Sequence, residues 1–421
     1  MELPQPTTTV LSPAVRTRVD RMLEEAAERQ ARRYPGAPTS RQPVHSVYVP
    51  AHQVDRDLVR DWAAAAERSV ARAGGIEHLL AVHGLIDDAD ERSAVGELVL
   101  AKLRREPIED LRIDFEDGYG AVADETEDAA VDGAVETIDA LRQDAQLPPF
   151  VGIRFKSLEP PTKARGLRTL ERFVAGLAAL GPLPAGLVLT LPKVTSVAQV
   201  EAMVLVLTEL ESALGLPDRL EFEIQVETPQ AILGPDGVSL LPQMIAAGDG
   251  RITGMPYGTY DYSAALGIAA GDQSMAHPAA DFAKAVMQVA AAGTAVRLSD
   301  GSTNVLPIGS ADEVDAAWAL HGRLVSRSLH NGFYQGWDLH PAQLPSRFAA
   351  TYAYFRRGLP ELARRLAAYL GDGGGAILDE PATARAMAAF LLRGIDCGAV
   401  GPEEVPFPDT ALRGIVANGP K

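Results

Sequence analysis

The sequence predicts an α/β fold, a TIM-type (β/α)8 barrel with an N-terminal helical extension and a helical C-terminal tail. About eight strand-like runs alternate with helical segments over residues 44–345, the strand number of such a barrel. The run GLVLTLPKV (186–194) is apolar along most of its length, which is typical of a buried parallel strand. Charged residues stand where several runs end, and the carboxyl ends of barrel strands form the face that carries active sites.

The expected strands follow the apolar runs in order. They are HSVYVPA (45–51), LRIDFED (111–117), FVGIRF (150–155), GLVLTLPKV (186–194), LEFEIQVET (220–228), RITGMPYG (251–258), a run within 296–310, and GFYQGWDLHP (332–341). Residues 296–310 are expected to form a hairpin, because Asp300-Gly301 is a common two-residue turn pair. The run HLLAVHGLI (78–86) fits either a strand or a helix.

Helices are expected between these strands, where apolar residues recur with a spacing of three to four. Their ranges are 55–73, 91–105, 126–144, 167–180, 196–214 with Ser196 as N-cap, 242–247, 279–292 and 311–331. The tail is expected to form helices at 348–357, 362–370, 380–392 and 403–416, with a break at GDGGG (371–375).

The chain before the barrel reads as a helix followed by a linker. The helix is expected over residues 12–33, with Val15, Val19, Met22 and Leu23 as its apolar face. The linker, YPGAPTSRQP, covers residues 34–43. The predicted organisation is therefore an N-terminal helix and linker (1–43), a catalytic barrel (44–345) and a helical extension (346–421).

Composition excludes several classes of partner and site. The formal net charge of −17 argues against nucleic acid and anionic membranes, because both would repel the chain. No apolar run reaches the ~20 residues of a membrane span, and the N-terminus has no signal-peptide pattern. The single cysteine, Cys397, rules out an internal disulfide and fits a cytoplasmic location.

Two acids at predicted strand ends suit a divalent metal ion. Glu227 lies in EFEIQVETPQ and Asp261 in MPYGTYDYSAALG. Two carboxylates at the mouth of a barrel can hold Mg²⁺ and leave positions open for substrate oxygens. The alternative is that both acids cap helices or form ion pairs, and Pro229 makes a helix start after Glu227 plausible. The two interpretations stay open at this point.

Further charged residues end neighbouring strands. In DFEDG, Asp114 and Glu116 should share one face of the strand, while Asp117 is placed to orient a water or shuttle a proton. Arg154 can hold a carboxylate and polarise a carbonyl oxygen, or form a salt bridge to these acids, or do both. Lys193, in LPKV, is expected to extend its ammonium group into solvent. The histidine spacing does not fit a zinc site.

Seven short motifs occur in the order that they have in a known protein family. HSVYVPA, DFEDG, GIRF, LPKV, VETPQ, GTYDYSAALG and GWDLHPAQ lie between residues 44 and 345. In this order they resemble the HpcH/HpaI aldolase and citrate lyase β-subunit (CitE-like) family. The resemblance implies a (β/α)8 barrel that makes or breaks a carbon–carbon bond next to a carbonyl, with Mg²⁺ or Mn²⁺ as cofactor.

The resemblance also implies residue roles. Glu227 and Asp261 would be metal ligands, and Arg154 would bind the substrate carboxylate and stabilise an enolate. The backbone N–H groups of residues 258–261, which include Gly258, Thr259 and Tyr260, would cradle the oxo-acid carboxylate. Catalytic roles would fall to the acidic motif Asp114, Glu116 and Asp117. The aspartate at position 117 matches the citrate lyase branch, whereas pyruvate aldolases carry histidine there.

The chain departs from this family in its length. Its tail could cover the barrel mouth or exchange between subunits, and Asp379 or Asp396 could supply a catalytic acid as in the longer malate synthases. The expected activity is a metal-dependent carbon–carbon lyase or aldolase acting on a small oxo-acid such as one that yields pyruvate. The alternatives are a lyase or synthase for CoA thioesters and a barrel that binds an oxo-acid without turnover. A homo-oligomer is expected, as is usual in the family.

Overall fold

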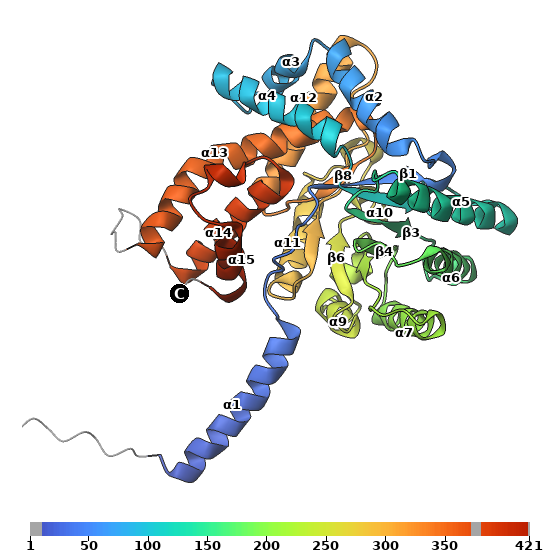
Figure 1. Ribbon diagram of the computed structural model, residues 1–421. Helices are drawn as coiled ribbons and strands as arrows, with labels where there is room; N and C mark the ends of the chain where they lie inside the picture. The colour runs from blue at the N-terminus through green and yellow to red at the C-terminus, as the bar shows by residue number, and fades with distance from the viewer. Residues whose placement is uncertain (1–10, 372–379, 420–421) are drawn as a thin grey trace, which may run out of the picture.

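The computed structural model describes residues 11–371 and 380–419 of the chain. In this part, eight parallel strands form one sheet in the order β7-β6-β5-β4-β3-β2-β1-β8, with helices outside it (Figure 1). The strands are β1 His45–Pro50, β2 Asp110–Asp114, β3 Phe150–Arg154, β4 Leu187–Leu191, β5 Phe222–Ile224, β6 Ile252–Pro256, β7 Arg297–Ser299 and β8 Gly336–Asp338. The predicted TIM-type barrel is confirmed.

The barrel closes between β7 and β8 through backbone hydrogen bonds just beyond β7. Asp300 N donates to Gln335 O at 2.8 Å, and Trp337 N donates to Gly301 O at 3.2 Å. The hairpin expected over 296–310 is therefore wrong. A two-residue hairpin turn needs positive φ, which neither Asp300 nor Gly301 has, and their backbone groups pair with β8 instead.

The helices that follow each strand surround the barrel. They are α2 Leu58–Arg72, α3 Ile76–His83, α4 Ala89–Arg105, α5 Asp124–Gln143, α6 Lys163–Leu180, α7 Val197–Leu214, α8 Pro229–Ile232, α9 Leu241–Ala247, α10 Thr259–Ala265, α11 Pro278–Ala291 and α12 Ala311–His330. The ambiguous run 78–86 lies largely in α3. Ser196 caps α7 in a capping box with Gln199, as its sequence position predicts.

The C-terminal tail packs at the amino-terminal end of the barrel strands. Its helices are α13 Leu344–Leu370, α14 Pro381–Cys397 and α15 Asp409–Asn418, which gather on one side of the molecule (Figure 1). Arg413 of α15 donates to the backbone of Thr39, which precedes β1, and pairs with Asp396 at 2.8 Å. Helices α14 and α15 thus lie at the end opposite the strand carboxyl ends and do not cover that mouth.

This position bears on Asp396, one of the two tail acids considered for catalysis. Asp396 is held by Arg413 at the wrong end of the barrel for catalysis. Asp379 and most of GDGGG lie outside the described residues. The two tail helices expected at 348–357 and 362–370 are one helix, α13, which continues through Pro360.

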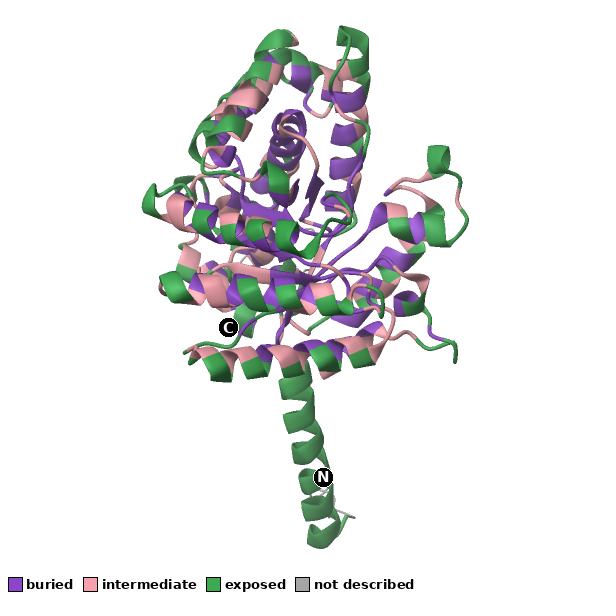
Figure 2. Ribbon diagram, turned by 90° about the vertical axis from the view of Figure 1, so that its right-hand side faces the viewer, coloured by how far each residue is buried: buried purple, intermediate pink, exposed green. Residues whose placement is uncertain are grey.

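The N-terminal helix α1, Pro13–Arg33, forms as predicted but packs on no other part of the chain that the structure describes. None of its residues is buried, and it projects from the body (Figures 1 and 2). The expected apolar face is exposed, with Met22 at 62% and Leu23 at 63%. After it, Gly36 N donates to Gly293 O at 2.9 Å, which anchors the linker beside α11.

The main core lies between the strands and the outer helices. Val47, Leu111, Val151 and Leu189 of four adjacent strands have no exposed surface. The inside of the barrel is unusually polar instead, since Arg112 bonds to both Asp110 and Glu223 there. Within the described residues, no helix has both the length and the apolar character needed to cross a membrane.

Candidate functional site

The carboxyl ends of five strands bring the predicted residues together. Asp114 and Arg154 end β2 and β3, Lys193 follows β4, Glu227 follows β5, and Asp261 lies in α10 after β6. Glu116 and Asp117 occupy the loop after β2. Because parallel strands of a barrel all point to the same face, residues that are distant in sequence meet at this mouth.

Arg154 is fixed by Asp114. Its Nε and Nη2 donate to the two Asp114 oxygens at 2.7 and 2.8 Å, a bidentate pair. The same oxygens accept the N–H groups of Glu116 and Gly118, so Asp114 also holds the loop after β2. Arg154 can therefore form this salt bridge and still bind a substrate oxygen, because its third nitrogen, Nη1, is not bonded to Asp114. Nη1 lies 3.3 Å from Glu116 Oε2.

Glu116 is a buried carboxylate between two cations. Its Oε2 lies near Arg154, and its Oε1 lies 3.0 Å from the Nζ of Lys193. Burial raises the pKa of Glu116 to about 7, although Arg154 and Lys193 favour its ionised form. A carboxyl group with a pKa near neutrality can both accept and return a proton, which suits a general base.

Glu227 lies deeper, with 2% of its surface exposed. Its Oε1 accepts the backbone N–H of Lys193 at 2.7 Å, and its Oε2 accepts from the side chain of Gln225. Burial raises the pKa of Glu227 to about 8, against the effect of Lys193 and Arg154. Gly258 must be glycine here, because a Cβ atom would stand 2.5 Å from the Glu227 Cβ.

Lys193 does not extend into solvent as expected. Its Nζ lies 2.7 Å from Asp261 Oδ2, 2.8 Å from Asp117 Oδ2 and 3.0 Å from Glu116 Oε1. Burial alone would lower the pKa of Lys193, but the carboxylates around it raise the pKa above its ordinary value. The side chain is therefore an ammonium ion at the centre of the acidic group.

The residues predicted to cradle a carboxylate begin helix α10. Gly258 is its N-cap, and Gly258 N donates to Val226 O at 2.9 Å. Thr259 Oγ1 and Tyr260 Oη both donate to the carbonyl of Ser302, at 3.5 and 3.4 Å. The hydroxyl groups of Thr259 and Tyr260 are thus engaged with the loop after β7. The Gly258 N–H is also taken, which corrects its predicted role and leaves the backbone N–H groups of residues 259–261 as the candidate donors.

Several residues of the site escaped the sequence analysis. Gln225 contacts Glu227, and the rings of Tyr48 and Trp337 stack at 4.3 Å with Arg154 over both. The alternation Glu223, Gln225, Glu227 places all three on one face of β5 and would have identified Gln225. Trp337 comes from β8, at the end of the sheet order, and no local sequence pattern indicates that it lies near Arg154.

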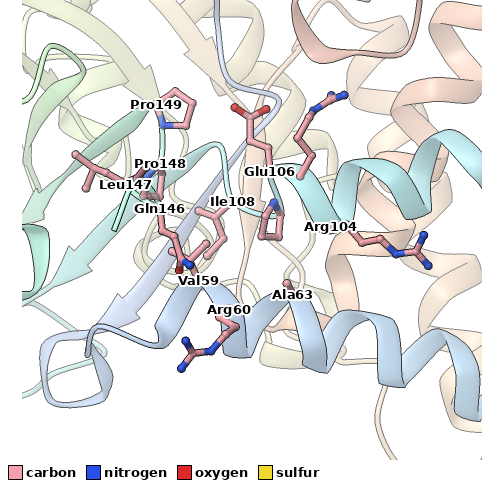
Figure 3. Close-up of a pocket in the computed structure, with 13 residues that line it drawn as sticks. Val59, Arg60, Ala63, Arg104, Glu106, Ile108, Gln146, Leu147, Pro148 and Pro149 are labelled. Carbon is pink, nitrogen blue, oxygen red and sulfur yellow. The ribbon is translucent and has the colours of Figure 1, made fainter. Parts of the chain in front are cut away.

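Two cavities lie at opposite ends of the barrel. One of about 470 Å³ is lined by residues of α2, the end of α4 and the segment before β3, and contains none of the predicted site residues (Figure 3). Another, of about 290 Å³, is lined by Glu116, Asp117, Lys156 and Lys193 among others. The second is the better candidate for chemistry, because it adjoins the carboxyl ends of the strands.

The donor set fits a divalent cation bound by few protein groups. No group of three His, Cys, Asp or Glu side chains in the described ranges is arranged to hold a metal. A cation at Glu227 and Asp261 would therefore take its other oxygens from water and substrate, as Mg²⁺ commonly does. The raised pKa of Glu227 shows a buried carboxylate whose charge its neighbours only partly compensate, which favours a cation there.

Comparison of the sequence with family models gives one match. Residues 23–415, most of the chain, match the model described as domain of unknown function DUF6986. The chain belongs to the DUF6986 family. A comparison of this DUF6986 protein with curated proteins found no match.

Solved structures share the fold of this DUF6986 protein. A citrate lyase from Burkholderia xenovorans superposes with a TM-score of 0.59 at 16% identity, covering 90% of this chain and 98% of its own. The magnesium/glyoxylate complex of malate synthase from Haloferax volcanii gives 0.50 at 14% identity, covering 84% and 88%. At these identities the likeness shows the barrel fold alone.

Proposed function

We propose that this protein is a divalent-metal-dependent carbon–carbon lyase or aldolase that acts on a small β-hydroxy oxo-acid. The observation that carries the proposal is the gathering of four acids around Lys193 at the strand carboxyl ends, next to Arg154. Glu116, Asp117 and Asp261 contact its ammonium group, and Glu227 contacts its backbone N–H. Buried like charges are costly, and a fold keeps them where a cation or a proton transfer uses them. The motif order quoted above and the citrate lyase and malate synthase folds support the same reading.

Glu227 and Asp261 would hold Mg²⁺ or Mn²⁺, which when bound acts as a Lewis acid toward the substrate carbonyl. Arg154 Nη1, the edge of the guanidinium not taken by Asp114, would bind the oxygen on which negative charge develops. Asp114 is then a positioning residue for Arg154. Backbone N–H groups in the first turn of α10, residues 259–261, would hold the substrate carboxylate.

Glu116 is our candidate for the base. It would accept the proton of the substrate β-hydroxyl group as the carbon–carbon bond breaks, so that the hydroxyl carbon leaves as a carbonyl compound and the bonding electrons form an enolate. The same carboxyl can return the proton to the enolate carbon. Asp117, more exposed and at the rim, would exchange protons with solvent.

Two alternatives share this site. A CoA thioester could replace the free acid, since a citryl-CoA, malyl-CoA or malate-synthase-like reaction needs the same enolate chemistry. A barrel that binds an oxo-acid without turnover is the other. We also keep the expectation of a homo-oligomer, which the exposed apolar residues of α1 support.

The test is metal-dependent cleavage. Purified protein with Mg²⁺ or Mn²⁺ is given 4-hydroxy-2-oxo acids and β-hydroxyacyl-CoAs, while pyruvate, glyoxylate, oxaloacetate and free CoA are followed. Glu227→Gln should abolish turnover, and Glu221→Gln, before the start of β5 at its far end, should not. Cleavage of only one substrate class decides between free acid and thioester. Bound Mn²⁺ without any turnover would favour the binding protein, and absence of metal binding would refute the proposal.

A further inference from the structure

Lys193 has an unusual backbone for a lysine. It stands two residues beyond β4, and its φ of 51° lies in the left-handed region that non-glycine residues disfavour. Such a conformation persists where the surrounding structure fixes it, and it is concentrated at functional sites. Here it lets one residue present both its backbone N–H and its side chain to the mouth of the barrel.

The two ends of Lys193 contact both predicted metal ligands. The backbone N–H binds Glu227 Oε1 at 2.7 Å, and Nζ binds Asp261 Oδ2 at 2.7 Å. The same Nζ also bridges Glu116 and Asp117, and only 25% of the side chain is exposed. Without a metal, this single ammonium ion supplies much of the positive charge that keeps the carboxylates at the mouth together.

A divalent cation at Glu227 and Asp261 would share the Asp261 carboxylate with the ammonium ion, which already holds its Oδ2. Two cations within a few ångströms of each other repel strongly at a partly buried site. We propose that Lys193 is a built-in counter-ion that competes with the divalent cation and must leave Asp261 when the cation binds. The inference rests on the proposed function, because it takes the metal site from there. The 290 Å³ cavity that Lys193 already lines gives the released side chain room.

If Lys193 competes with the cation, its removal should strengthen metal binding, whereas removal of a residue that supports the metal site should weaken it. Removing the ammonium ion should tighten metal binding, because the carboxylates are then left for the cation alone. Binding of free Mn²⁺ to the substrate-free protein, measured by electron paramagnetic resonance, reports this without any activity. We expect Lys193→Gln to lower the Kd for Mn²⁺ at least about tenfold, within the roughly 5- to 150-fold range of coupling between competing sites.

Three variants make the result specific. Lys193→Arg keeps the charge and should bind Mn²⁺ within about twofold of the wild type, within the usual spread of such measurements. Lys163→Gln removes one positive charge at the exposed start of α6, near the cavity, and should also bind Mn²⁺ about as tightly as the wild type. Glu227→Gln should abolish binding, which locates the measured site. Lys193→Met provides a second neutral variant if thermal melting shows that the glutamine variant does not fold.

The outcomes separate the two proposals. Wild-type binding of Mn²⁺ with equal or weaker binding by both neutral Lys193 variants would overturn the competition and leave the lyase proposal standing. A similar gain in Lys163→Gln would also overturn it, since a general charge effect would then explain the result. If no variant binds Mn²⁺ at millimolar concentration, the metal site itself is refuted, and the role of Lys193 with it.

Discussion

His83 offers a pH-dependent test of how the helices around the barrel are packed. The ring is buried between α3, α12 and α13, where Nε2 lies 2.9 Å from Ser346 Oγ, and a Cβ atom on Gly322 would stand within 3 Å of the ring. Within the described residues, Nδ1 has no hydrogen-bond partner. Burial, with a smaller contribution from His321, lowers the pKa of His83 from 6.5 to about 3.

The sign and size of the effect follow from this shift. Between pH 3 and pH 6.5 the unfolded chain binds a proton at His83 that the folded chain does not, so the folded state loses stability as the pH falls below 6.5. At pH 5 the loss is about 1.5 pH units at 1.36 kcal/mol each, or about 2 kcal/mol. At pH 7.5 it is close to zero, because both states are then neutral at this residue.

The assay is urea unfolding at pH 7.5 and pH 5.0 for the wild type and for His83→Gln. All other titrating groups are common to both proteins, so the difference between their two pH-dependent losses isolates His83. We expect the wild type to lose about 2 kcal/mol more than the variant. The same substitution at exposed His52 should leave the wild-type loss unchanged. Equal losses in the wild type and His83→Gln would refute the reasoning.

Three further predictions concern other parts of the structure. Gly258→Ala should cost about 1–3 kcal/mol of unfolding free energy and weaken Mn²⁺ binding, because its Cβ would stand 2.5 Å from that of Glu227. Gly133→Ala in α5, where an added Cβ meets nothing within 4 Å, should change neither quantity, and thermal melting and Mn²⁺ titration of both variants test this. The pKa of Asp338 lies well below its usual range, because Arg347 and His321 outweigh the opposing effect of burial. Arg347→Met should therefore cost about 3–5 kcal/mol in urea unfolding, since it leaves a buried charge poorly paired. Removing residues 1–33 should change the unfolding free energy by no more than about 0.5 kcal/mol, because α1 buries none of its residues; a larger loss would mean that α1 packs on a partner in solution.

Much of the barrel is predictable from local pattern. The strands through β6 match the expected runs to within one residue, because their outward-facing residues, such as Val151 and Leu189, are apolar and bury against helices. The closing strand pair is different. Asp300-Gly301 has the composition of a hairpin turn, and only β8, far along the chain, provides the partners that keep it extended.

In the C-terminal tail, too, the local sequence pattern does not predict a structure that depends on distant residues. Gly358 and Pro360 argue for a helix end, yet α13 continues through both. Gly358 lies so close to Phe390 of α14 that a Cβ atom would stand 2.4 Å from the ring. Tertiary packing against α14 therefore overrides a local signal that predicts two helices, and Gly358, between the two predicted helices, is the residue that allows the close approach.

At the site, residue types were predictable but their mutual arrangement was not. Acids and Arg154 at strand ends follow from the apolar runs that precede them. The position of the Lys193 ammonium ion depends on its left-handed backbone and on loops after β2 and β6, which the sequence does not relate to one another. A lysine at a strand end extends into solvent unless such long-range partners exist, and the structure supplies three.

Among buried and half-buried carboxylates whose pKa is shifted, the direction of the shift differs, and the difference indicates where chemistry belongs. Arg41 and Lys102 outweigh burial at Glu106 and hold its pKa near 2, so its charge is satisfied. Burial raises the pKa of Glu116, Glu227 and Asp110, which marks negative charge that the neighbouring cations do not fully compensate. Asp110 is enclosed inside the barrel beside Arg112, where no ligand reaches it. Glu116 and Glu227 stand instead at the strand carboxyl ends, where Glu116 lines the 290 Å³ cavity and Glu227 is bonded to Lys193, which also lines it. An incoming cation can supply the missing charge there and nowhere else among these groups.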